Sequence, residues 1–149
     1  MTLRNRDWRD AVLVTLIGSW LPLGIWASIA PQSFYDSFPG FGRTWVSPDG
    51  PFNEHLLRDI GGLWLGLSAL LIYALVQRTP QLVRAAGLVV VVFSVPHVSY
   101  HIVKFDVLGL GDGAASLVSL VFVLTLGLGL LLSPASPDAN TPEVRTESP

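Results

Sequence analysis

The chain has 149 residues, of which half are hydrophobic and only 13% are charged. Soluble domains carry about a quarter charged residues, so this composition favours a membrane protein. The net charge is -2, the basic residues form no patch that would bind nucleic acid, and the absence of cysteine excludes disulfides, thiolate metal sites and Cys-x-x-Cys electron transfer.

Four apolar stretches are long enough, or nearly long enough, to cross a bilayer as helices. A hydrocarbon core about 30 Å thick needs about 20 helical residues. Backbone polar groups in lipid must be paired within each segment, and none of the four stretches alternates as a barrel strand would. We therefore predict an all-α fold, a four-transmembrane-helix bundle in one domain over residues 1–132. The predicted helices cover 11–30, 56–76, 85–103 and 114–132.

The first helix is expected to be retained in the membrane. The run Ser28-Ile29-Ala30 has the small-x-small form of a signal-peptide cleavage site. However, the preceding apolar run is longer than the roughly 7–15 residues of a signal peptide. Pro31 also follows the site directly, and its fixed φ fits an extended protease site poorly.

The Lys and Arg residues in the connecting segments indicate the orientation, because they are enriched on the cytoplasmic side. An orientation with both ends inside places six basic residues inside and three outside. The inner six are Arg4, Arg6, Arg9, Arg78, Arg84 and Arg145, and the outer three are Arg43, Arg58 and Lys104. The proline-containing end, 133–149, is then predicted to be a disordered cytoplasmic tail.

Two connections bear on the packing of the predicted helices. The segment 31–53 is long and rich in aromatic residues, and we expect it to lie outside, on the membrane surface or over the bundle. The link 77–83 is short, so the second and third helices should be antiparallel neighbours. Gly62 and Gly66 form a small-xxx-small pair on the second helix, which is typical of a close helix contact.

Ionisable side chains gather at the outward ends of the second and third helices. With a rise of about 1.5 Å per residue, Asp59 and His101 lie at a similar depth, and His97 lies deeper. Ionisable groups at membrane depth almost always face the interior of a bundle. We therefore expect an outward-facing polar pocket between the second, third and fourth helices. Its expected lining residues are Glu54, His55, Arg58, Asp59, Ser94, His97, His101 and Ser116.

Three interpretations of this cluster remain open. The histidines could form hydrogen bonds that clasp two helices together, or they could line a pocket for a small molecule or a proton. Alternatively, His97 and His101, spaced as in zinc helices, could bind Zn²⁺ or Fe²⁺ together with Asp59, His55 or Glu54. The His-x-x-x-His spacing lacks the intervening Glu of protease helices. The sequence fixes no cofactor, although a metal is one candidate.

Three runs of sequence resemble small bacterial four-helix membrane proteins of unknown function. These runs are 38–42, 45–61 and 96–101. The architecture is also similar to that of the DoxX-like proteins, through the number and polarity of the helices. The resemblance covers roughly residues 8 to 132 and implies a four-helix bundle, without implying an activity.

The sequence therefore predicts a multi-pass protein of the cell membrane, not identified as an enzyme, whose partner is the lipid bilayer. We expect it to bind a small ligand or lipid in its outer pocket, with a homo-oligomer as one arrangement. One alternative is a membrane-bound redox enzyme that uses a metal or a quinone at His97, His101 and Asp59. Another alternative is a structural or partner-binding membrane subunit.

Overall fold

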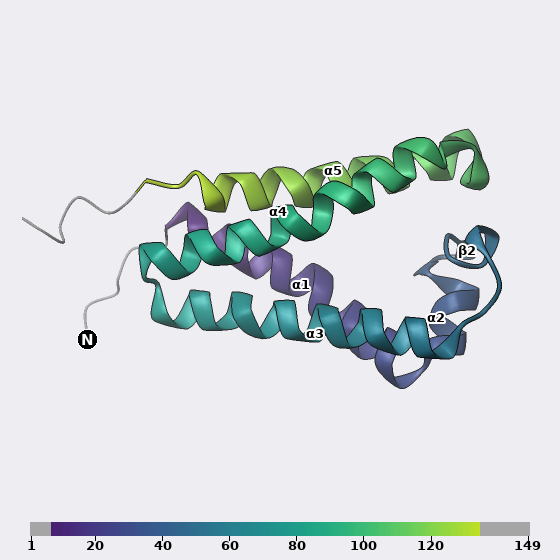
Figure 1. Cartoon of the computed structure of the whole chain (residues 1–149), viewed down its shortest axis with the longest axis horizontal. Coiled ribbons are helices and arrows are strands. Elements are labelled where there is room, and N and C mark those ends of the chain that lie inside the picture. Colours follow the sequence, from purple (N-terminus) through teal and green to yellow (C-terminus); the bar gives the residue numbers. More distant parts are fainter. Residues whose placement is uncertain (1–6, 135–149) are drawn as a thin grey trace, which may run out of the picture.

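The computed structural model of the chain describes residues 7–134, which form a mostly helical molecule (Figure 1). The elements in chain order are α1 (Trp8–Ile29), α2 (Pro31–Ser37), β1 (Pro39–Gly40), β2 (Arg43–Thr44), α3 (Glu54–Gln77), α4 (Pro80–Val103) and α5 (Gly109–Leu131). Two short 3-10 turns, η1 (Ser47–Asp49) and η2 (Phe105–Leu108), precede α3 and α5.

Four helical segments are long and apolar enough to cross a membrane, which confirms the predicted number of spans. They are Trp8–Ile29, Glu54–Gln77, Pro80–Val103 and Phe105–Leu131. Both described ends of the chain lie at the end of the bundle that holds the turn between α3 and α4, here named the turn end (Figure 1). The opposite end, which holds residues 38–53, is named the loop end.

The spans begin and end where capping residues allow it. Asn53 precedes α3, and its side-chain oxygen accepts a hydrogen bond from the Leu56 amide at 3.1 Å. Thr79 caps α4 in the same way, and Pro80 occupies the first helical position, which needs no amide donor. With Thr79 and Pro80 at its start, α4 begins five residues before the predicted start at residue 85.

The connection 31–53, predicted as a loop, contains regular structure. It begins with α2 and continues into a hairpin in which Pro39 pairs with Thr44 and Gly40 with Arg43. Phe34 of α2 is 2% exposed, and its ring contacts those of Trp26, Phe38 and Trp64. The segment therefore covers the loop end of α1 and α3 by packing aromatic rings onto them.

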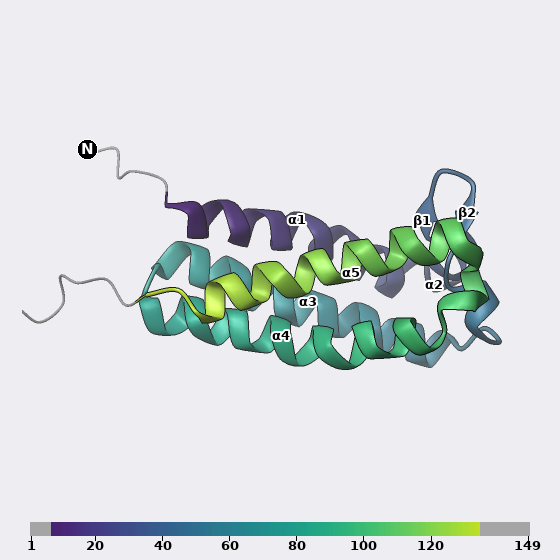
Figure 2. The same cartoon turned by 90° about the horizontal axis from the view of Figure 1, so that it is seen from above.

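The spans pack as two antiparallel pairs, α1 with α3 and α4 with α5 (Figures 1 and 2). Glycines allow the backbones of each pair to approach closely. A β-carbon added to Gly61 of α3 would lie 2.7 Å from the Ser28 amide nitrogen, and one added to Gly24 would lie 3.0 Å from the Gly61 carbonyl oxygen. Gly87 of α4 meets the backbone of Gly127 in α5 in the same manner.

The two pairs meet over a smaller area than the helices within each pair. The consecutive helices α3 and α4 are joined by the short turn, as predicted, but they diverge toward the loop end (Figure 1). Near mid-height the ring of Trp20 in α1 contacts the edge of Phe93 in α4, with centroids 5.3 Å apart. From about the middle of the bundle to the loop end, α3 and α4 lie farther apart than at the turn end (Figure 1).

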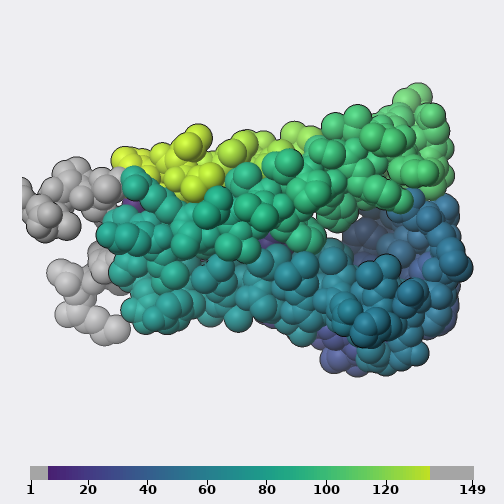
Figure 3. Space-filling view, viewed as in Figure 1, coloured from purple at the N-terminus to yellow at the C-terminus, as the bar shows by residue number. Residues whose placement is uncertain are grey.

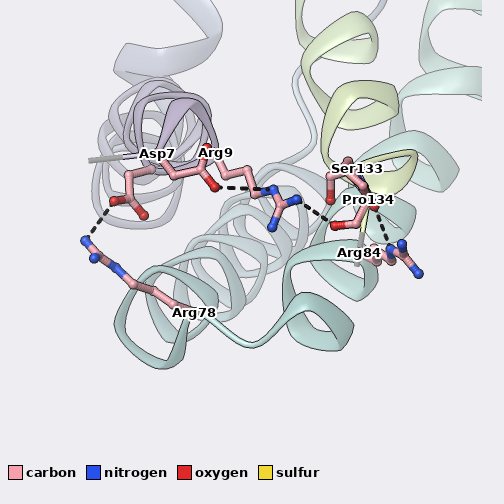
Figure 4. A network of polar contacts seen from close by, with 7 residues as sticks. Asp7, Arg9, Arg78, Arg84, Ser133 and Pro134 are labelled. Carbon is pink, nitrogen blue, oxygen red and sulfur yellow. Dashed lines mark hydrogen bonds and ion pairs between the residues drawn. The ribbon is translucent and has the colours of Figure 1, made fainter. Parts of the chain in front are cut away.

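A polar network joins the helices at the turn end (Figure 4). The guanidinium of Arg78 lies 2.8 Å from the carboxylate of Asp10, whose side chain is 12% exposed. Arg9 donates a hydrogen bond to the Pro134 carbonyl at 2.6 Å, and Arg84 donates one to the Ser133 carbonyl at 2.8 Å. The network therefore links both pairs where they converge. The remainder of the predicted tail, 135–149, lies outside the described residues.

Candidate functional site

The side chains of His97 and His101 lie one turn apart on α4, with ring centroids 5.0 Å apart. Both are partly buried. Together with Phe93 they follow an i, i+4, i+8 pattern, and the edge of the Phe93 ring contacts His97 at a centroid distance of 5.4 Å. Because Phe93 also contacts Trp20, the two imidazoles lie on the side of α4 that faces the α1–α3 pair.

Ser116 brings α5 to the same place. Its hydroxyl oxygen lies 3.5 Å from Nδ1 of His101, and the side chain is 3% exposed. A β-carbon added to Gly113, one turn earlier on α5, would lie 2.7 Å from the Phe105 carbonyl oxygen, so there is no room for one. That close contact allows α5 to begin beside the end of α4. His97, His101 and Ser116 are named the histidine cluster.

The loop end adds an acidic residue above the histidine cluster. Tyr100 donates a hydrogen bond to Oδ1 of Asp49 at 3.1 Å, and its ring contacts the His101 ring edge-on at 5.6 Å. Tyr35 of α2 donates a hydrogen bond to the Gly50 carbonyl at 2.5 Å, which fixes the loop beside Asp49. Asp49 and Tyr100 were not among the predicted site residues, because no local pattern links residues 51 positions apart.

A second polar contact ties the hairpin to α5. Arg43 of β2 forms a short ion pair with Asp112, which lies in the first turn of α5. A carboxylate at this position is favourable because the first amides of a helix carry partial positive charge. The loop 38–53 is therefore held over the α4–α5 pair by two contacts, from Asp49 and from Arg43.

A hollow separates the two helix pairs beside the histidine cluster. Figure 3 shows it between α3 and α4 toward the loop end, where the two pairs diverge. His97 and His101 lie on the side of α4 that faces the α1–α3 pair, nearer to the loop end than the Trp20–Phe93 contact. The space between α3 and α4 in Figure 3 is named the loop-end hollow.

Several buried polar groups in the same half of the bundle lack hydrogen-bond partners among the described residues. They include the Ser94 hydroxyl and the indole nitrogens of Trp45 and Trp64. Ser94 is 3% exposed and Trp64 is 7% exposed. An unpaired buried donor costs free energy comparable to a lost hydrogen bond.

The four expected site residues of α3 lie apart from the histidine cluster. Asp59 pairs with His55 of its own helix at 3.3 Å, and the two side chains are 63% and 89% exposed. Within residues 7–134, no hydrogen bond or ion pair links Asp59 to His97 or His101. The structure therefore corrects the expected pocket, which splits into a histidine cluster on α4–α5 and an exposed group on α3.

The other two members of the α3 group serve the α1–α3 pair. Arg58 contacts Glu54 at 2.8 Å and donates a short hydrogen bond to the Ser28 carbonyl near the end of α1. Both side chains border a shallow, open depression of about 630 Å³ that α2 also lines. Their roles are thus distinct from those of the histidines.

The α3 side chains lie apart from the histidine cluster because of the rotation of α3 about its own axis. Its buried seam comprises Leu57, Gly61, Trp64, Leu67, Ser68, Leu71 and Ala74. The expected contact through Gly62 and Gly66 is wrong within the described molecule, because a β-carbon on either one would meet nothing within 4 Å. Gly61 makes the close helix contact instead.

The metal interpretation needs Asp59, His55 or Glu54 beside the two imidazoles, whereas all three form ion pairs within α3. Among residues 7–134, no group of three or more His, Cys, Asp or Glu side chains could hold a metal ion. The arrangement instead provides two adjacent imidazoles that can each donate and accept hydrogen bonds. Comparison with protein-family models, curated proteins and solved structures gives no significant match.

Proposed function

We propose that the protein is a multi-pass protein of the cell membrane that binds a small amphipathic molecule in the loop-end hollow. The molecule would present an oxygen-bearing head group, such as a carbonyl, hydroxyl or carboxyl, to the histidine cluster. Its apolar part would lie against the aromatic side chains at mid-height. In this proposal both termini face the cytoplasm, so the hollow lies in the outer half of the membrane, beneath the loop 38–53.

The observation that supports this proposal is the pair of partly buried imidazoles with unused hydrogen-bonding capacity. His101 has only the long 3.5 Å contact with Ser116, and no hydrogen bond to the His97 ring is found in the described part of the chain. A neutral imidazole carries one donor and one acceptor. Two of them on successive turns match a head group that both accepts and donates.

The orientation rests on the distribution of basic residues. Arg9, Arg78 and Arg84 lie at the turn end, whereas Arg43, Arg58 and Lys104 lie at the loop end. The three further arginines that favour a cytoplasmic turn end, Arg4, Arg6 and Arg145, belong to the segments beyond the described residues. The positive-inside rule then assigns the loop end to the outer face.

The experiment is to purify the protein in a mild detergent and to identify bound small molecules by native mass spectrometry. The wild type is expected to retain a molecule, and His97→Ala and His101→Ala are each expected to reduce the bound fraction at least tenfold. His97→Gln, which keeps hydrogen-bonding capacity, should retain more than His97→Ala. Ser99→Ala is the matched control, because Ser99 is exposed on the opposite face of α4 at the same level.

Equal retention by His97→Ala, His101→Ala and Ser99→Ala would contradict the proposal. If the two histidine variants lose thermal stability and the wild type never carries a molecule, the imidazoles act as a structural clasp. Metal analysis and an absorption spectrum of the same preparation would identify a metal or a quinone, which are the chemistries of the redox alternative.

A further inference from the structure

The outward face of α3 combines small residues with an ion pair. Its residues follow an i, i+4, i+7, i+11, i+14 pattern, which places them on one side of the helix, away from the buried seam. They are His55, Asp59, Gly62, Gly66 and Ala69, and all five are exposed. This set is named the α3 outer face.

The two glycines of the α3 outer face have no packing role inside the described molecule. A β-carbon added to Gly62 or Gly66 would meet nothing within 4 Å, whereas one added to the neighbouring Gly61 would collide with Ser28. Glycine in a helix interior is less favourable than alanine, so its presence at two exposed positions needs another reason. The small-xxx-small pair therefore leaves a flat strip on which another helix backbone can lie closely.

The ion pair at the top of this strip faces away from the protein's own bundle. Asp59 lies about 7–8 Å along the helix from the first residue of α3, at about 1.5 Å per residue. Ionisable groups in transmembrane segments almost always face protein or a water-filled cavity. The side chain of Asp59 is 63% exposed and that of its partner His55 is 89% exposed. We therefore expect the surface of another protein molecule to cover both side chains.

We propose that the α3 outer face is the interface of a homodimer, with α3 of a second copy lying across Gly62 and Gly66. A twofold interface brings the same patch together from both copies, so the patch must complement itself. The α3 outer face does so, because it carries an imidazole and a carboxylate one turn apart. His55 of each copy then pairs with the partner's Asp59, and the two glycine strips allow the backbones to approach.

The absence of cysteine allows a direct test by disulfide cross-linking in liposomes. Ala69→Cys places one thiol on the α3 outer face, two helical turns from Gly62. Val118→Cys is the matched control on α5, where the side chain is 69% exposed. Oxidation is expected to yield at least fivefold more cross-linked dimer from Ala69→Cys than from Val118→Cys at equal protein density.

The glycine strip is tested in the Ala69→Cys background by Gly62→Ile and Gly66→Ile. Each is expected to reduce cross-linking at least fivefold while leaving the monomer folded, because both positions face open space. Gly18→Ile is the control, since Gly18 of α1 is also exposed and also free of neighbours. Asp59→Asn, His55→Ala and the double variant should weaken the dimer to a similar extent, because either single change removes both pairs across the twofold interface.

Equal cross-linking from Ala69→Cys and Val118→Cys would overturn the proposal, as would single-molecule photobleaching that shows only monomers. Loss of cross-linking in Gly18→Ile to the same extent as in Gly66→Ile would also overturn it. None of these substitutions replaces a residue of the histidine cluster, so the result is independent of ligand binding.

Discussion

The guanidinium of Arg78 lies 2.8 Å from the carboxylate of Asp10, and this ion pair joins the end of α3 to the first turn of α1. Arg78 adopts a left-handed backbone conformation, with φ of 55°, immediately after α3. The residue that ends α3 thus also secures the neighbouring helix. Arg9 and Arg84 of the same network donate hydrogen bonds to the backbone carbonyls of Pro134 and Ser133, which follow α5.

Replacement of Asp10 by Asn should lower the free energy of unfolding by about 1–3 kcal/mol, because it leaves the Arg78 charge partly buried without its partner. Unfolding of the purified protein in a denaturing detergent measures this change. Asp7→Asn is the control, since Asp7 is 49% exposed and lies 3.5 Å from Arg9. A loss as large in Asp7→Asn would show that the Arg78 contact is not the cause.

Gly87→Ala should destabilise the α4–α5 pair by about 1–3 kcal/mol, because the added methyl group collides with the α5 backbone at Gly127 and Leu131. Gly18→Ala should be neutral or stabilising by up to about 1 kcal/mol, because alanine favours helix and Gly18 faces open space. Thermal denaturation of the two variants in the same detergent makes the comparison. Equal midpoints would refute the close contact.

The proposed orientation predicts the accessibility of introduced thiols in intact cells. Ser37→Cys at the loop end should react with a membrane-impermeant maleimide without permeabilisation, because Ser37 is exposed beside the hairpin. Gln81→Cys at the turn end should react only after permeabilisation. The opposite pattern would invert the orientation and place the loop-end hollow on the cytoplasmic side.

Tyr100→Phe removes the hydrogen bond to Asp49 and should loosen the loop over the histidine cluster. The expected cost is about 1 kcal/mol, since both groups are partly exposed to solvent. Hydrogen exchange should then accelerate severalfold in the segment Ser47–Asp49, while exchange within α3 stays unchanged. Unaltered exchange in this loop would mean that Arg43–Asp112 and Tyr35 hold it without Tyr100.

The spans were predictable because length and apolarity alone define them, and a bilayer requires both. The rotation of α3 about its own axis could not be predicted, because Gly61 and Gly62 are adjacent and equally small. Hydropathy does not choose between their faces in a helix that is apolar nearly all round. The choice depends on Ser28 and Gly24 of α1, which meet Gly61 across the helix pair.

The candidate site shows the same division between local and distant information. The spacing of His97 and His101 on one face follows from the helix itself, and the structure places them one turn apart. The placement of Asp59 outside this group depends on the setting of α3. The contact between Asp49 and Tyr100 depends on how the hairpin and α2 fold over the bundle, which no periodicity in the sequence records.

Each of the two helix pairs consists of consecutive spans, α1 with α3 and α4 with α5. This has a consequence for biogenesis. As the chain leaves the ribosome, α1 meets its main partner as soon as α3 is inserted, and α4 then needs only α5. Each antiparallel pair can close as a unit before the two units join at the turn end. Truncation after residue 79 should therefore leave a protease-resistant α1–α3 hairpin in the membrane, and truncation within α3 should not.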